Sequence, residues 1–105
     1  STPLYSSAAA DVYKRQVHAV YASIHLDRVI FKNAISDALD LDICEADIKN
    51  SLFEGSLNDG VDLMSTRATI VGSDFQNNGD KGISVGENSH LVGINNTLER
   101  NVIGV

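Results

Sequence analysis

The stretch NDGVDLM, residues 58–64, has counterparts at an interval of 22 residues on both sides. SDALDLD occupies residues 36–42, and DKGISVG occupies residues 80–86. Each copy begins with turn-forming residues and continues with aliphatic residues at alternate positions, which is the period of a β-strand with one buried face. The sequence therefore predicts a repeat in which every pass of 22 residues contains such a strand.

Apolar columns appear when the sequence is read in steps of 22 residues. The columns are Val17, Leu39, Val61, Ile83 and Val105; Ala19, Leu41, Leu63 and Val85; Leu26, Ile48, Ile70 and Val92; and Phe31, Phe53 and Phe75, followed after 23 residues by Leu98. Turns rich in Asn, Asp, Gly and Ser separate the short strands. This pattern predicts an all-β fold, a parallel β-helix (solenoid) of about four coils in which like side chains stack on like.

Two features refine this expectation. Gly60 and Gly82 recur at the entry to the strand, where the backbone requires either positive φ or close approach of a neighbouring chain segment. Leucine-rich repeats have a similar period, but their Leu-x-x-Leu-x-Leu signature and helical segment are missing from this sequence.

The first sixteen residues do not follow the repeat. DVYKRQ within them resembles the translation of a sequencing adaptor, so we predict an adaptor-derived or disordered leader over residues 1–16 and β-helix repeats over residues 17–105. The apolar columns are cut at both ends of this range. We therefore expect a fragment of a longer solenoid, with the neighbouring coils of a longer chain as its partners.

Composition limits the classes of partner. The 105 residues are enough for one domain, and their formal charge of −6 argues against nucleic acid as a partner, because phosphates need a basic face. No apolar run reaches the length of about 18 residues that a membrane span needs. Cys44 is the only cysteine and cannot form an internal disulfide.

Residues 17–105 resemble the right-handed parallel β-helix proteins of the pectin-lyase-like class. The phrases NDGVDL and NNGDKGISVGENS are similar to β-helix regions of bacterial surface proteins that also carry a CotH-kinase-like domain. This resemblance implies a secreted or cell-surface location and contact with polysaccharide.

Acidic side chains follow the same repeat on the outer face. If Leu39 and Leu41 point inward, then His18, Asp40, Asp62 and Ser84 form an outward line on successive coils. The candidate ligand-binding residues are His18, Asp37, Asp40, Asp42, Asp59 and Asp62. Adjacent carboxylates are hard oxygen ligands, so Asp40 and Asp62 are the candidate calcium ligands. The alternatives are a solvated face, carbohydrate binding or acid–base catalysis.

An enzymatic interpretation has one motif in its favour. NDGVD followed by GDKG resembles the polygalacturonase-type pattern, in which Asp59 and Asp80 would match catalytic aspartates, but Lys81 replaces the next Asp. We therefore assign no catalytic residue and expect a structural or ligand-presenting β-helix segment. The alternative is a fragment of a polysaccharide lyase, glycoside hydrolase or epimerase with an incomplete catalytic set.

Overall fold

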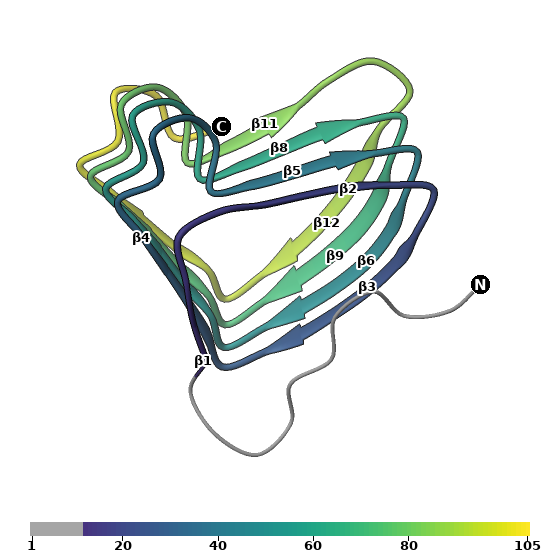
Figure 1. The fold of residues 1–105 in the computed structure, drawn as a ribbon, viewed down its shortest axis with the longest axis horizontal. Helices are drawn as coiled ribbons and strands as arrows, with labels where there is room; N and C mark the ends of the chain where they lie inside the picture. Colours follow the sequence, from purple (N-terminus) through teal and green to yellow (C-terminus); the bar gives the residue numbers. More distant parts are fainter. Residues whose placement is uncertain (1–11) are drawn as a thin grey trace.

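The computed structural model describes residues 12–105, which form thirteen β-strands in three parallel sheets (Figure 1). The first sheet contains β2 (Val17–Val20), β5 (Leu39–Asp42), β8 (Val61–Met64) and β11 (Ile83–Val85). The second contains β3 (Ser23–Asp27), β6 (Glu45–Lys49), β9 (Arg67–Val71) and β12 (His90–Ile94). The third contains β1 (Val12–Lys14), β4 (Val29–Lys32), β7 (Leu52–Glu54), β10 (Asp74–Gln76) and β13 (Thr97–Glu99). Each coil takes one strand from every sheet, so the predicted four-coil parallel solenoid is confirmed.

The strand register follows the 22-residue interval through the first three coils. In the first sheet Leu39 pairs with Val61, and in the third sheet Phe31 pairs with Phe53. The prediction for Val92 is wrong, because Ile70 pairs with Gly93 and Val92 lies outside with 56% of its surface exposed. Six positions separate the starts of β8 and β9, Val61 and Arg67, whereas seven separate the starts of β11 and β12, Ile83 and His90. This added residue shifts β12 by one position from the 22-residue interval and reverses the faces predicted for its side chains.

The core is a narrow apolar column enclosed by the three sheets. It contains a stack of Phe31, Phe53 and Phe75, whose ring centroids lie 4.9 and 4.8 Å apart with interplanar angles of 8° and 2°. Leu39, Leu41, Val61, Leu63, Ile48 and Ile70 are also fully buried. The centroid spacing equals the distance of about 4.8 Å between hydrogen-bonded strands, so the stacking of coils imposes the stacking of rings.

Corners between the sheets hold residues in the left-handed region. These residues are Tyr21, Ile43, Ser65 and Asn88 between the first and second sheets; Arg28, Asn50, Gly72 and Asn95 between the second and third; and Asn33, Gly55, Asn77 and Arg100 after the third. In many of these corners the next residue has a buried polar side chain. This side chain accepts a hydrogen bond from a backbone N–H of the preceding coil. Thr66, Ser73 and Asn78 accept from the backbone N–H groups of Cys44, Ser51 and Ser56 respectively.

Close packing explains the recurrence of glycine at the entry to the first sheet. A Cβ atom on Gly60 would lie 2.6 Å from the carbonyl oxygen of Gly82, and one on Gly82 would lie 2.9 Å from the carbonyl oxygen of Gly104. Neither glycine has positive φ. Of the two reasons predicted from sequence, close backbone approach is therefore the one that applies.

The third sheet begins before residue 17. Strand β1 pairs in parallel with β4, with Val12 opposite Val29 and Lys14 opposite Phe31, so the boundary predicted between leader and repeats does not coincide with the start of strand pairing. The rest of the predicted leader, residues 1–11, lies outside the described residues. Within residues 12–105, no helix has the length and apolar character required to cross a membrane.

Candidate functional site

The outward line of the first sheet carries the candidate site. His18 pairs with Asp40, Asp40 with Asp62, and Asp62 with Ser84. The side chains point outward because their strand neighbours, such as Leu41 and Leu63, are fully buried. The inward and outward assignment made from sequence is therefore confirmed for these strands.

Three carboxylates converge at this line. Asp37, Asp40 and Asp62 each offer an oxygen atom, and the three oxygens lie within 4.8 Å of one another. Asp40 and Asp62 belong to β5 and β8, whereas Asp37 lies in the turn that leads into β5. We call these three residues the acidic cluster.

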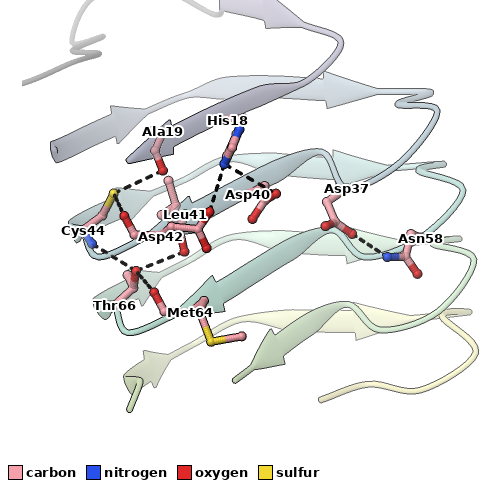
Figure 2. A network of polar contacts seen from close by, with 10 residues as sticks. All are labelled: His18, Ala19, Asp37, Asp40, Leu41, Asp42, Cys44, Asn58, Met64 and Thr66. Carbon is pink, nitrogen blue, oxygen red and sulfur yellow. Dashed lines mark hydrogen bonds and ion pairs between the residues drawn. The ribbon is translucent and has the colours of Figure 1, made fainter. Parts of the chain in front are cut away.

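Hydrogen bonds from the next coil fix Asp37. Its Oδ1 atom accepts a hydrogen bond from the side-chain amide of Asn58 at 2.8 Å (Figure 2). The same atom accepts the backbone N–H of Asp59 at 2.9 Å. Asp37 and Asp59 are both among the ligand-binding residues predicted from sequence. In the structure the Asp37 carboxylate binds the Asp59 backbone and joins Asp40 and Asp62. Asn58 is a further positioning residue, which the repeat pattern does not indicate.

His18 and Asp42 extend the site along the same sheet. The Nε2 atom of His18 lies 2.9 Å from Asp42 Oδ2 and 3.8 Å from Asp40 Oδ2 (Figure 2). The hydrogen bond with Asp42, followed by the charge of Asp40, raises the pKa of His18 above 6.5. This imidazole therefore partly balances the negative charge of Asp40 and Asp42.

Partial burial and like charge make it unfavourable for all the carboxylates of the acidic cluster to be ionised at once. Partial burial, followed by the charges of Asp37 and Asp40, raises the pKa of Asp62 from 3.8 to about 6. Partial burial and the charge of Asp42 also raise the pKa of Asp40, against the opposing effect of His18. A proton or a cation relieves this repulsion.

The stability of the chain should depend on pH through this cluster. The raised pKa of Asp62 means that the folded chain holds a proton more tightly than the unfolded chain, so stability falls as pH rises from about 3.8 through about 6. The raised pKa values of Asp40, Asp59 and His18 act in the same direction. A rise in pKa of this size corresponds to about 3 kcal/mol, and solvent screening leaves an expected loss of about 1 kcal/mol over that pH range.

Urea unfolding across this pH range measures that loss. Asp62→Asn should fold and should flatten the dependence, because the amide does not titrate. Asp74→Asn, which changes a partly exposed carboxylate of the third sheet, is the matched control and should retain the slope. A slope unchanged in Asp62→Asn would contradict the assignment.

Asp59 has a different environment from the acidic cluster. Only 5% of its surface is exposed, and its Oδ1 accepts the backbone N–H of Lys81 at 2.9 Å. Lys81 Nζ in turn lies 3.3 Å from Asp80 Oδ2. The two aspartates that matched the glycosidase pattern are thus a buried acceptor for a backbone amide and a member of an ion pair, which is a structural arrangement of the turn.

Comparisons with known proteins agree with this architecture. The sequence model of the family described as right handed beta helix region matches residues 16–105. No curated protein and no solved structure gives a significant match to the chain.

Proposed function

This chain belongs to the right-handed β-helix family, and on that premise we propose that it is a structural, ligand-presenting segment of a secreted or cell-surface bacterial protein, with a Ca²⁺ site at the acidic cluster. The observation that carries the proposal is the convergence of the Asp37, Asp40 and Asp62 oxygens within 4.8 Å of one another. Calcium is bound in proteins by six to eight oxygens, and carboxylates contribute one or two each.

The surroundings of the cluster support a cation over a proton as its partner. Asp40 and Asp62 are held in register by two hydrogen-bonded strands, and Asp37 is held by Asn58 and the Asp59 backbone. The carboxylates therefore keep their positions when a ligand binds, which reduces the entropic cost of binding. At neutral pH, a bound divalent cation would replace the repulsion that raises the pKa of Asp62 with attraction.

Polysaccharide is the macromolecular ligand that we propose for this face. A Ca²⁺ ion held by three carboxylates on an open sheet retains coordination positions that water or sugar oxygens fill. Asp42 and His18 lie beside the cluster and supply further hydrogen-bonding groups. The solenoid then acts as a rigid support that presents a cation and polar side chains to a carbohydrate chain.

Calcium titration by calorimetry tests the proposal. We expect saturable binding with one ion per chain and a dissociation constant of about 0.1–1 mM, the range of extracellular calcium sites. Calcium at ten times a dissociation constant of 1 mM should raise the free energy of unfolding by about 1.4 kcal/mol. Asp62→Asn and Asp40→Asn should each abolish binding under these conditions.

The control replaces an acidic residue outside the cluster. Asp47→Asn changes a carboxylate of the second sheet that lies near His25 and Lys49, and it should leave calcium binding unchanged. Equal binding of calcium by the wild-type chain and by Asp62→Asn would contradict the proposed site. Absence of binding by the wild-type chain would reduce the cluster to a solvated acidic face.

A further inference from the structure

The corner after β10 joins two residues that the fold requires for separate reasons. Asn78 is buried, and its side chain links three successive coils through hydrogen bonds to Ser56 and Asn101. Gly79 follows it because the loops of adjacent coils touch here, and a Cβ atom would clash with the carbonyl oxygen of Leu57. Together they form the only Asn-Gly pair in the sequence.

An Asn-Gly pair is chemically labile, because glycine has no side chain to hinder attack on the asparagine amide. The backbone nitrogen of Gly79 loses its proton to water and forms a bond to Cγ of Asn78. The bond between Cγ and Nδ2 breaks, and Nδ2 takes up a proton and leaves as ammonia. Water then opens the cyclic imide at either of its carbonyl groups, which produces aspartate or isoaspartate. Water is the only co-reactant.

The equivalent corners of the other coils lack this pair. The equivalent residues are Ala34 and Ile35, Ser56 and Leu57, and Asn101 and Val102. Asn101 is also an asparagine, but the branched side chain of Val102 hinders attack by the backbone nitrogen. Among these four corners, only the third combines a reactive amide with an unhindered backbone nitrogen.

The folded structure engages both reacting groups. Asn78 Oδ1 accepts hydrogen bonds from Ser56, and Nδ2 donates to the carbonyl oxygen of Phe53 and to Asn101. The backbone N–H of Gly79 donates to the carbonyl oxygen of Ser56 at 2.9 Å. The attack requires the side chain to rotate and the Gly79 nitrogen to lose its proton, so these hydrogen bonds must break first. The reaction rate therefore follows the fraction of molecules in which this corner is open.

Either product disrupts the closed corner. Aspartate replaces the Nδ2 donor of Asn78 with an oxygen that faces two acceptors, the carbonyl oxygen of Phe53 and Asn101 Oδ1. It also places a charge at a site with 2% exposure. Isoaspartate adds a carbon atom to the main chain, at a turn where Gly79 and the Leu57 backbone are already in close contact. Neither product can restore the native hydrogen bonds.

We propose that Asn78 and Gly79 form a deamidation site that the folded solenoid holds closed. Opening of the third and fourth coils exposes the pair to water, and the modification prevents these coils from closing again. A transient opening thus becomes permanent, and the stability of this corner sets the lifetime of the native solenoid. The site lies apart from the acidic cluster and is independent of calcium.

The test follows modification at position 78 by peptide mapping and mass spectrometry. The full chain is held in a mildly alkaline EDTA buffer, either alone or with urea above the unfolding midpoint, and a synthetic peptide of residues 74–83 measures the effect of urea on the chemistry itself. After this correction, we expect modification to be at least about ten-fold slower in the folded chain than in urea. Asn101 should remain unmodified under both conditions while position 78 reacts.

Three variants test the lock and its consequence. Asn101→Ala removes an acceptor of Asn78 Nδ2, and it should raise the rate at position 78 several-fold in the folded chain but not in urea. Arg100→Ala changes the neighbouring exposed residue, which hydrogen-bonds Asn77 instead, and should leave both rates unchanged. Asn78→Asp carries one of the products, and it should unfold at a lower urea concentration than the wild-type chain.

Three results would overturn the proposal. One is an equal corrected rate at position 78 in the folded chain and in urea. Another is a wild-type rate in an Asn101→Ala chain that circular dichroism shows to be folded. The third is an unchanged unfolding midpoint in Asn78→Asp, which would show that the closed coils accept the product. Because EDTA is present throughout, none of these results depends on the calcium site.

Discussion

Phe53→Ala is expected to lower the free energy of unfolding by about 3–5 kcal/mol, the range for removal of a fully buried aromatic ring. Phe53 has no exposed surface and lies between two rings, with centroids 4.9 Å from Phe31 and 4.8 Å from Phe75. Truncation removes both stacking contacts and leaves a cavity in the middle of the solenoid. The backbone cannot close this cavity, because the coil spacing is fixed by hydrogen bonds in all three sheets.

Urea unfolding of Phe53→Ala, Phe53→Leu and Leu52→Ala separates ring loss from general truncation. Leucine occupies the same column at Leu98, so Phe53→Leu should cost only about 1–1.5 kcal/mol. Leu52 lies in the same strand and points outward, half-buried, so Leu52→Ala should cost less than about 1 kcal/mol. Equal losses in Phe53→Ala and Leu52→Ala would show that the stack does not hold the coils together.

The repeat was predictable because successive strands are 22 residues apart wherever the connecting turns keep their lengths. This constancy places Leu39 over Val61 and Phe31 over Phe53, and both pairings can be read from the 22-residue interval. It fails where a turn changes length: one added residue before β12 moves Val92 from the core column to the surface. Length changes within turns have no compositional signature, so the period alone could not predict this shift.

The candidate site was predictable only where it lies on strands. Alternation in β5 and β8 placed Asp40 beside Asp62, whereas the position of Asp37 depends on the path of a turn. That path is set by hydrogen bonds of Asp37 with Asn58 and the Asp59 backbone. The second of these recurs 22 residues later between Asp59 and the Lys81 backbone, but the period alone does not show that the carboxylate accepts from a backbone N–H. The left-handed corners at Tyr21 and Ile43 were also not predicted, because these are not residue types that indicate positive φ.

Buried polar side chains at the corners also link the coils, and among them Asn78 makes the most side-chain hydrogen bonds. Its Oδ1 atom accepts the backbone N–H of Ser56 at 3.1 Å and the Ser56 hydroxyl at 2.8 Å. Its Nδ2 group donates to the carbonyl oxygen of Phe53 at 3.2 Å and to Asn101 Oδ1 at 2.8 Å. One side chain thus links three successive coils with hydrogen bonds that water cannot replace at a site with 2% exposure.

Asn78→Ala is therefore expected to lower the free energy of unfolding by about 2–4 kcal/mol, because it leaves the buried Ser56 N–H without a partner, at about 1–3 kcal/mol, and removes the side-chain hydrogen bonds to the Ser56 hydroxyl, the Phe53 carbonyl and Asn101. Asn78→Ser should lose less, since serine occupies the equivalent corner position at Ser56 and retains a hydroxyl acceptor. Gln76→Ala, on the outer face of the third sheet, is the control for truncation of an amide side chain. Urea unfolding measures all three variants. A loss in Asn78→Ala no larger than that in Gln76→Ala would mean that water enters the corner and satisfies these groups.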